Sequence, residues 1–182
     1  MKIPLKYAYK LLSPRVVVLV TTVDEKGRIN AAPFSFCGPV SFNPPMLYVG
    51  VREFQHTYKN IKKTGEFVVN IVSEDFAQKA IECEKAYPYG VNELEKVGLH
   101  WYDSEKVKPP RVKEAKIHLE CKFKKEIRIG DHIMIIGEVI AADAKKVRED
   151  YTPDFKEVKV VMHASGEKFY LVGKEIKFKR GK

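Results

Sequence analysis

One segment is rich in groups that could contact a flat ligand with polar edges. Residues 30–45 read NAAPFSFCGPVSFNPP, a run dense in small residues, hydroxyls and prolines. Small residues let a ligand approach the backbone closely, and hydroxyls with free backbone amides suit phosphate or carbonyl oxygens. An irregular edge strand with bulges has the same composition, so at this point both interpretations stay open.

A second candidate segment joins the end of a strand to the start of a helix. Residues 52–63 read REFQHTYKNIKK. A helix N-terminus offers unpaired N–H groups and the positive end of the helix dipole. Further donors around it come from Arg52, His56, Thr57, Lys59 and Asn60. The segment predicts a site for a phosphate monoester, and the alternative is a solvated, basic helix face.

The other titratable residues give weaker signals. His132 follows a Gly-Asp turn, and His163 falls near the end of a strand, where a lone histidine is usually a surface residue. Histidines and carboxylates are too scattered to predict a metal site, and no Ser-His-Asp spacing stands out. The three cysteines, Cys37, Cys83 and Cys121, are widely spaced without a CxxC motif, which fits a reducing compartment.

The elements that must position these residues are mostly strands. Residues 15–22 (RVVVLVTT) and 29–36 predict a hairpin around a turn at 24–27, and Pro33 marks an edge or an irregular stretch within it. A short helix over 54–63, ended by Gly65, is expected next. Further strands are predicted over 46–51, 66–72, 117–123, 132–142, 158–163 and 168–172. The stretch 117–123 has the clearest period-2 alternation.

Two helical or irregular stretches interrupt the strands. Ser73 is a candidate N-cap for a helix whose apolar face is formed by Phe76, Ala77, Ala80 and Ile81. Residues 87–112 are a long excursion with one short helix around 92–97, expected to cover part of the core or a site. The excursion carries apolar residues that need burial: Leu94, Val97, Leu99, Trp101 and Tyr102.

These elements predict one domain over residues 1–182 with mainly antiparallel strands, because the strands follow one another through short turns. The sequence lacks a GxGxxG motif after the first strand and a P-loop. No apolar run reaches the length of a membrane helix, and the first residues lack the apolar region of a signal peptide. We therefore expect a cytoplasmic protein with no membrane partner.

The net charge is +9, from 33 basic and 24 acidic residues, which favours anionic partners. The basic residues are spread along the chain, and only the stretch 174–180 is dense. A nucleic-acid-binding β-barrel would interleave aromatic residues on a basic strand face. The face that carries Lys122 and Lys124 lacks them, so we expect no nucleic acid and favour a phosphate-bearing cofactor.

Several motifs occur in an order that is typical of one family. They are VVVLVTT, GRINAAPFSF, VSFNPPMLYVGV, HTYKNIKKTGEFVVNIV, LECKF, GDHIMIIGEV and HASGEKFYLVG, and together they span about residues 15–173. Each motif alone is weakly specific. Their number, order and spacing resemble the flavin reductase-like family of FMN-binding split-barrel proteins, on its flavoredoxin-like side.

The resemblance implies an antiparallel split β-barrel with Greek-key wiring, about six barrel strands and two or three peripheral helices. It implies a homodimer with FMN at the subunit interface. His132 maps near the nicotinamide site, as the catalytic candidate. Cys37 stands where relatives vary, and three alternatives stay open for it: a flavin contact, a thiol that takes part in redox chemistry, or a packed thiol. The implied flavin-binding residues are Asn30, Ala31, Ala32, Pro33, Ser35, Phe36, Cys37, Ser41, Arg52, His56, Thr57 and Lys59.

The function that the resemblance implies is electron transfer from NAD(P)H through FMN to a flavin, a ferric complex or a redox partner protein. The alternative is a flavoredoxin-type electron carrier without direct NAD(P)H activity. Flavin supplies the redox chemistry in both cases, which agrees with the lack of a catalytic triad. The sequence does not distinguish NADH from NADPH, nor a bound cofactor from a passing flavin substrate.

Overall fold

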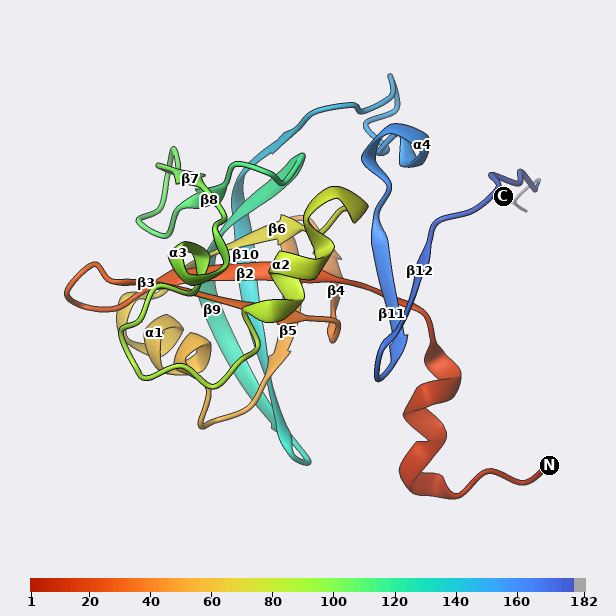
Figure 1. The fold of residues 1–182 in the computed structure, drawn as a ribbon, viewed down its shortest axis with the longest axis horizontal. Helices are drawn as coiled ribbons and strands as arrows, with labels where there is room; N and C mark the ends of the chain where they lie inside the picture. The colour runs from red at the N-terminus through yellow and green to blue at the C-terminus, as the bar shows by residue number, and fades with distance from the viewer. Residues whose placement is uncertain (179–182) are drawn as a thin grey trace.

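The computed structural model describes residues 1–178 and shows the mainly β, antiparallel fold that the sequence predicts (Figure 1). The end of the basic stretch 174–180 lies outside the described residues. The helical segments are η1 (Leu5–Leu12), α1 (His56–Thr64), η2 (Glu74–Phe76), α2 (Ala77–Glu82), α3 (Glu93–Val97) and α4 (Phe155–Val158). The strands are β1 (Arg15–Val16), β2 (Val18–Val23), β3 (Ile29–Phe34), β4 (Cys37–Phe42), β5 (Pro45–Val51), β6 (Glu66–Ile71), β7 (Trp101–Tyr102), β8 (Arg111–Val112), β9 (Ile117–Ile129), β10 (His132–Ala144), β11 (Val161–Ser165) and β12 (Lys168–Leu171).

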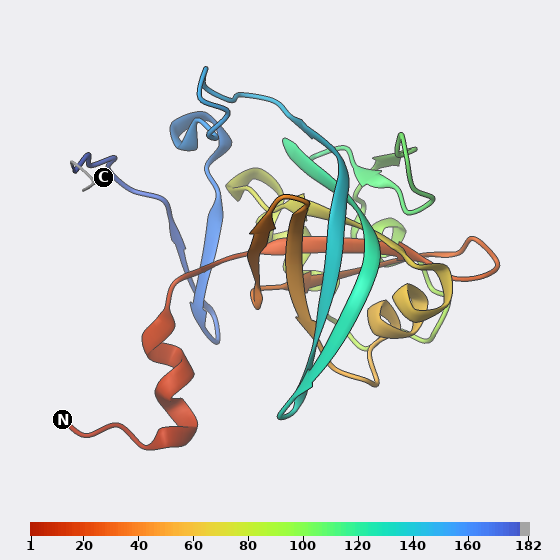
Figure 2. The same cartoon turned by 180° about the vertical axis from the view of Figure 1, so that it is seen from behind.

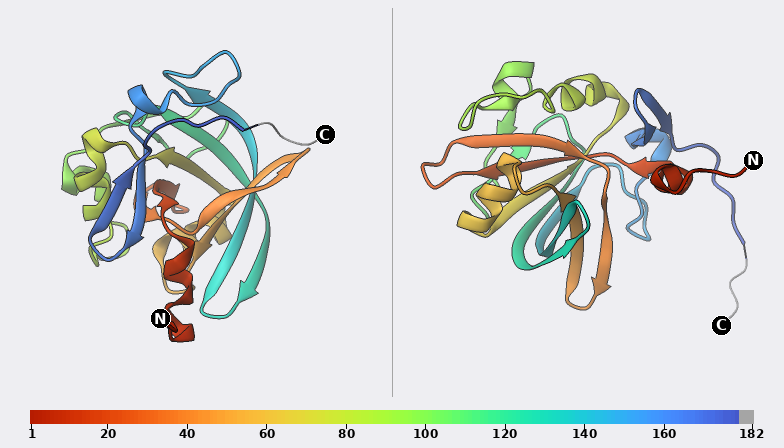
Figure 3. Two further views of the ribbon diagram at one scale, coloured as in Figure 1. Left: turned by 90° about the vertical axis from the view of Figure 1, so that its right-hand side faces the viewer. Right: turned by 90° about the horizontal axis from the view of Figure 1, so that it is seen from below.

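Seven strands form the main sheet in the order β3-β2-β6-β9-β10-β5-β4, and every pairing in it is antiparallel. The backbone N–H of Gly50 in β5 donates to the carbonyl of Phe36, just after β3, at 2.6 Å. This bond extends the pairing of β4 with β5, and the two end strands of the sheet, β3 and β4, are connected by residues 35–36 alone. Figures 2 and 3 show the curled barrel. The sheet has one strand more than the six that the resemblance implies.

The apolar run in β2 is continuous because both of its faces are buried, which is typical of a strand between two covering layers. Val18 and Val20 point into the barrel and pack against α1. Val17, just before β2, and Leu19 belong to a second core under α2 and α3. Helices α2 and α3 therefore lie on the outer side of β2 and β3, as Figure 3 shows.

Two predictions about the termini of elements need correction. Ser73 occupies the predicted N-cap position, before η2, but its hydroxyl donates to the Asp75 carboxylate and makes no capping bond to the helix. The predicted helix accordingly begins as a 3-10 turn before α2. The strand predicted over 158–163 begins only at Val161, because residues 155–158 form the short helix α4.

The excursion over residues 87–112 covers the outer core, as predicted, with Leu94 and Leu99 fully buried. Trp101 and Tyr102 were expected to be buried and are each 38% exposed, because their short strand β7 pairs only with β8 at the surface. Within the described residues, no helix is both long and apolar enough to cross a bilayer.

Candidate functional site

Strand β3 forms an edge of the main sheet, as Pro33 predicts, and its side chains are anchored to neighbouring elements. Asn30 is buried and its amide donates to the hydroxyls of Thr22 and Thr57, each at 3.2 Å. The backbone N–H of Ala31 donates to the Glu93 carboxylate at 2.8 Å. These bonds hold β3 against the first turn of α1 and against α3.

A cavity of about 310 Å³ opens where β3 meets the start of α1. The residues that line it include six of the predicted flavin-binding residues: Asn30, Ala31, Ala32, Pro33, His56 and Thr57. The other walls come from residues 54–55, residues 83–87 and Glu93. The two segments that sequence analysis singled out, apart in the chain, thus both line one cavity and meet at the Asn30–Thr57 hydrogen bond.

The start of α1 supplies the donors that an anion requires. Gln55 occupies the N-cap position but makes no side-chain capping bond, because its side-chain oxygen accepts from the Arg52 backbone N–H at 2.7 Å. Thr57 is 1% exposed and its hydroxyl lies in the first turn. Uncapped amides and the positive end of the helix dipole favour a phosphate or a carboxylate at this point.

Two titratable groups in the cavity have shifted pKa values. Desolvation, followed by the nearby charge of Lys59, lowers the pKa of His56, whose ring contacts Tyr89 edge-on with centroids 5.1 Å apart. Burial raises the pKa of Glu93, although the Ala31 N–H opposes this effect. Both shifts favour the neutral forms of these two side chains.

Several predicted residues lie outside this cavity. Arg52 and Lys59 are exposed, and Arg52 faces Asp131 at 3.7 Å. His132 bonds Asp131 at 2.7 Å, and its ring lies 5.1 Å from that of Phe36. Arg52, Asp131 and His132 form a separate group at the turn between β9 and β10. Ser41 lies further along β4, where it pairs with Met46.

Cys37 packs against the barrel core, and its thiol lies 3.7 Å from the Val16 carbonyl. Burial raises its pKa to about 12, which leaves almost no nucleophilic thiolate at neutral pH. These contacts favour a packed thiol over a redox role.

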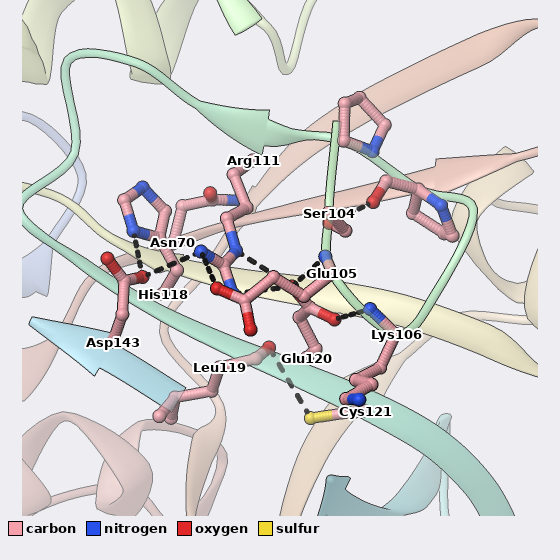
Figure 4. A network of polar contacts seen from close by, with 12 residues as sticks. Asn70, Ser104, Glu105, Lys106, Arg111, His118, Leu119, Glu120, Cys121 and Asp143 are labelled. Carbon is pink, nitrogen blue, oxygen red and sulfur yellow. Dashed lines mark hydrogen bonds and ion pairs between the residues drawn. The ribbon is translucent and has the colours of Figure 1, made fainter. Parts of the chain in front are cut away.

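The sequence analysis missed a buried polar network beneath the excursion (Figure 4). Glu120 is wholly buried and accepts from the backbone N–H groups of Glu105 and Lys106 at 2.8 and 2.7 Å, and from Arg111 Nε at 2.8 Å. Arg111 Nη2 also lies 2.6 Å from Glu120 Oε1, as an ion-pair contact. The alternation along β9 indicated a polar face, but not that other residues cover it.

The same network reaches the end of β10 through His118, which is also buried. Its ring nitrogens lie 2.8 Å from Asp143 Oδ1 and 2.9 Å from the Val112 carbonyl. Asn70 accepts from the Val112 N–H at 2.9 Å and donates to the Leu19 carbonyl at 2.9 Å. The network therefore fastens the end of the excursion, residues 105–112, to the barrel.

Comparison with known proteins identifies the class of this fold. The model of the flavin reductase like domain matches residues 11–163, and the chain belongs to this family, which binds flavin. Proteins with related sequences include an uncharacterized protein of Aquifex aeolicus, 40% identical over 140 residues that cover 74% of this chain and 71% of that protein. An uncharacterized protein of Archaeoglobus fulgidus is 31% identical over 174 residues, covering 96% and 94%.

Solved structures agree with this assignment. Nitrilotriacetate monooxygenase component B from Bacillus cereus superimposes with a TM-score of 0.89 at 30% identity, covering 97% of this chain and 95% of that one. Flavoredoxin of Desulfovibrio vulgaris (Miyazaki F) superimposes with a TM-score of 0.85 at 27% identity, covering 98% and 97%. The split-barrel fold expected from the sequence is thus confirmed.

Proposed function

We propose that this chain binds FMN and transfers electrons from NAD(P)H through the flavin to a flavin, ferric or protein acceptor. The observation that carries the proposal is the cavity between β3 and α1, which joins a wall of small residues to an uncapped helix start. When bound, FMN supplies the hydride and electron chemistry, and the protein supplies its placement.

The residues of the cavity suit the two ends of FMN. Thr57 and the first amides of α1 suit the phosphate, which carries about two negative charges. Ala31, Ala32 and Pro33 lack long side chains, so a flat ring can approach the backbone of β3. The Glu93 carboxylate accepts a hydrogen bond from the backbone N–H of Ala31 and thereby fixes the position of this strand.

We further propose a homodimer, because three elements present large exposed apolar residues. Leu5 and Leu12 in η1 are 90% and 78% exposed, Phe42 in β4 is 96% exposed and Tyr170 in β12 is 55% exposed. Exposed apolar surface of this kind marks interaction sites. A two-fold partner would bring its own strands to the cavity, so residues outside it, such as His132, could serve the same flavin.

Flavin titration tests the site. Thr57→Ala should weaken FMN binding by about 1–3 kcal/mol, as the loss of a buried or charge-assisted hydrogen bond does, whereas Thr57→Ser should retain it. Arg52→Ala tests whether this exposed arginine contributes to the same site, with a similar loss expected. Thr152→Ala, in an exposed turn, is the matched control. A protein that neither perturbs the flavin spectrum nor quenches its fluorescence would contradict the proposal.

A flavoredoxin-type carrier is the second candidate function, favoured by the similarity to flavoredoxin over nearly the whole chain. Stopped-flow mixing with NADH and NADPH separates the two functions. A reductase bleaches its bound flavin rapidly with at least one nucleotide. A carrier binds FMN equally well and shows no fast bleaching.

A further inference from the structure

The segment between α2 and α3, residues 84–91, forms an outer wall of the proposed flavin cavity, and is called the strap below (Figure 1). Residues 84–87 line that cavity. The first three of them are exposed, so they stand between the cavity and solvent. Glu84 also lines a larger cavity of about 970 Å³, whose lining includes Ser35 and His163. A ligand of the smaller cavity would thus be bounded on one side by the strap.

The backbone of the strap is weakly attached to the rest of the fold. Within residues 1–178, each backbone hydrogen bond that the strap makes joins it to carbonyls of residues 81–88 in the same stretch. No strap residue, all of which the structure describes, is buried. Exposed segments with few hydrogen bonds to their neighbours open at a low free energy. The strap can therefore detach while the sheet stays intact.

Tyr89 provides the polar contact that holds the strap in place. Its hydroxyl donates to Asn60 Oδ1, on α1, at 2.9 Å. Within residues 1–178, this is the one hydrogen bond between the strap and either α1 or the sheet. The ring of Tyr89 also contacts that of His56 edge-on, with centroids 5.1 Å apart. One side chain thus joins the strap to the helix that carries the proposed phosphate site.

Arg28, at the start of β3, contacts the same part of the strap. Its Cζ lies 5.4 Å from the centroid of the Tyr89 ring, which is a cation–π contact. The guanidinium is held in place because its Nε donates to Asp24 Oδ2 at 2.7 Å and Asp24 is buried. Gly90 has a φ of 88°, and a Cβ at this position would overlap the Arg28 guanidinium. Glycine is therefore required for the strap and Arg28 to pack together.

The acceptor of the Tyr89 bond is fixed by groups that belong to the cavity. Asn60 is 1% exposed, and its amide donates to Thr22 Oγ1 at 3.1 Å. The same Thr22 oxygen accepts from the Asn30 amide, which also donates to Thr57. Asn30 and Thr57 line the smaller cavity. A buried polar chain thus connects the cavity lining to the residue that Tyr89 contacts.

We propose that Tyr89 is a latch that holds the strap closed over the smaller cavity, and that release of this latch is the step through which FMN enters and leaves. This inference rests on the proposed function, since the cavity is the one assigned to FMN. Tyr89 lies outside the described lining of the cavity, so it acts as a positioning residue. Slow exchange makes FMN a held cofactor and fast exchange makes it a passing substrate, so the strength of the latch bears on this distinction.

Limited proteolysis of the flavin-free, full-length protein tests the latch. Trypsin cleaves after Lys85, and cleavage follows the fraction of protein in which the segment is open. Tyr89→Phe keeps the ring and removes the hydroxyl, so cleavage between Lys85 and Ala86 should become about fivefold faster, as the loss of one hydrogen bond predicts. Tyr151→Phe, which changes an 89% exposed tyrosine, is the matched control and should leave this rate unchanged. Unchanged cleavage in Tyr89→Phe overturns the latch.

Stopped-flow fluorescence with FMN tests the effect of the latch on exchange. In Tyr89→Phe, the rates of FMN binding and release should both rise about fivefold, and Kd should stay the same. Both rates change together because opening precedes both steps and the lost hydroxyl does not contact the ligand. A higher Kd with an unchanged binding rate would indicate a direct ligand contact and overturn the inference. Unchanged rates would overturn it as well.

Gly90→Ala tests the contact with Arg28 while the tyrosine hydroxyl stays in place. The added Cβ should displace the strap, so cleavage and both exchange rates should rise as in Tyr89→Phe. Gly166→Ala is the matched control, since Gly166 also has a positive φ, of 55°, but its Cβ would meet open space. An effect of Gly90→Ala without one of Tyr89→Phe would assign the closure to Arg28 and overturn the role of Tyr89.

Flavin binding by the unmodified protein is measured by fluorescence quenching in the same samples. Failure to bind FMN would contradict the proposed function and the exchange step, while faster cleavage after Lys85 in flavin-free Tyr89→Phe would still support the latch. FMN binding with exchange and cleavage unchanged in Tyr89→Phe would leave the proposed function intact and overturn this inference.

Discussion

Replacing Glu120 by glutamine tests how strongly the buried network holds residues 103–112 on the barrel. Glu120 is 0% exposed and accepts from two backbone N–H groups and from Arg111. Glutamine has the same shape but only one acceptor oxygen, so at least one of these donors would face an N–H group. The substitution also removes the charge that compensates Arg111, which is 4% exposed.

The expected cost follows from what Arg111 retains. Removing one partner of a buried ion pair costs about 3–5 kcal/mol. Arg111 would keep Asp143 and Glu105, each with an oxygen at 3.3 Å, so the lower end, about 3 kcal/mol, is expected. For a chain of this size, that loss lowers Tm by about 6–12 °C.

Urea unfolding and calorimetry measure this loss, and limited proteolysis locates it. The Glu120→Gln protein should be cleaved faster within residues 103–110, because their backbone N–H groups lose their acceptors. Glu105→Gln is the matched control, since Glu105 is 65% exposed and its ion pair with Arg111 contributes little. A loss below about 1 kcal/mol for Glu120→Gln would refute the reasoning that a buried, compensated charge anchors this segment.

Two further predictions concern the smaller cavity and Cys37. Burial raises the pKa of Glu93, so its contribution to stability is present below about pH 4 and is lost as pH rises through the folded-state value. Glu93→Gln should therefore flatten the decline in unfolding free energy between pH 4.5 and pH 8, and an unchanged pH profile would argue against a buried carboxylate there. For Cys37, a pKa of about 12 means that at pH 8 about one thiol in 10,000 is ionised. Native protein should thus react slowly with a thiol reagent until it is unfolded, and a fast-reacting thiol that disappears in Cys37→Ser would contradict this packing.

The strands and the local structure of the site were predictable because they depend on short-range patterns. The β-branched run at 15–22 predicted β2, Pro33 predicted an edge strand, and Gly65 ended α1 with a left-handed conformation at φ 72°. The small residues of β3 and the donors at the start of α1 were also visible in the sequence. What the sequence could not show is that these two segments line one cavity.

Burial of the polar groups was decided by tertiary structure. Alternation along β9 distinguishes its two faces but does not say what covers each one, so His118 and Glu120 could not be distinguished from solvated residues. They are buried because residues 103–112 fold over them and supply Arg111 and backbone N–H donors.

Sequence also could not show which residues form the hydrogen-bonded pairs beside each cavity. Glu93 reaches Ala31 across 62 positions of sequence, and His163 reaches Ser35 across 128. Sequence by itself determined the strands, the edge and the helix start, because local backbone preferences and side-chain periodicity specify them. Only the folded chain decided which polar groups meet, because long-range contacts depend on how the sheet curls and which segments cover it.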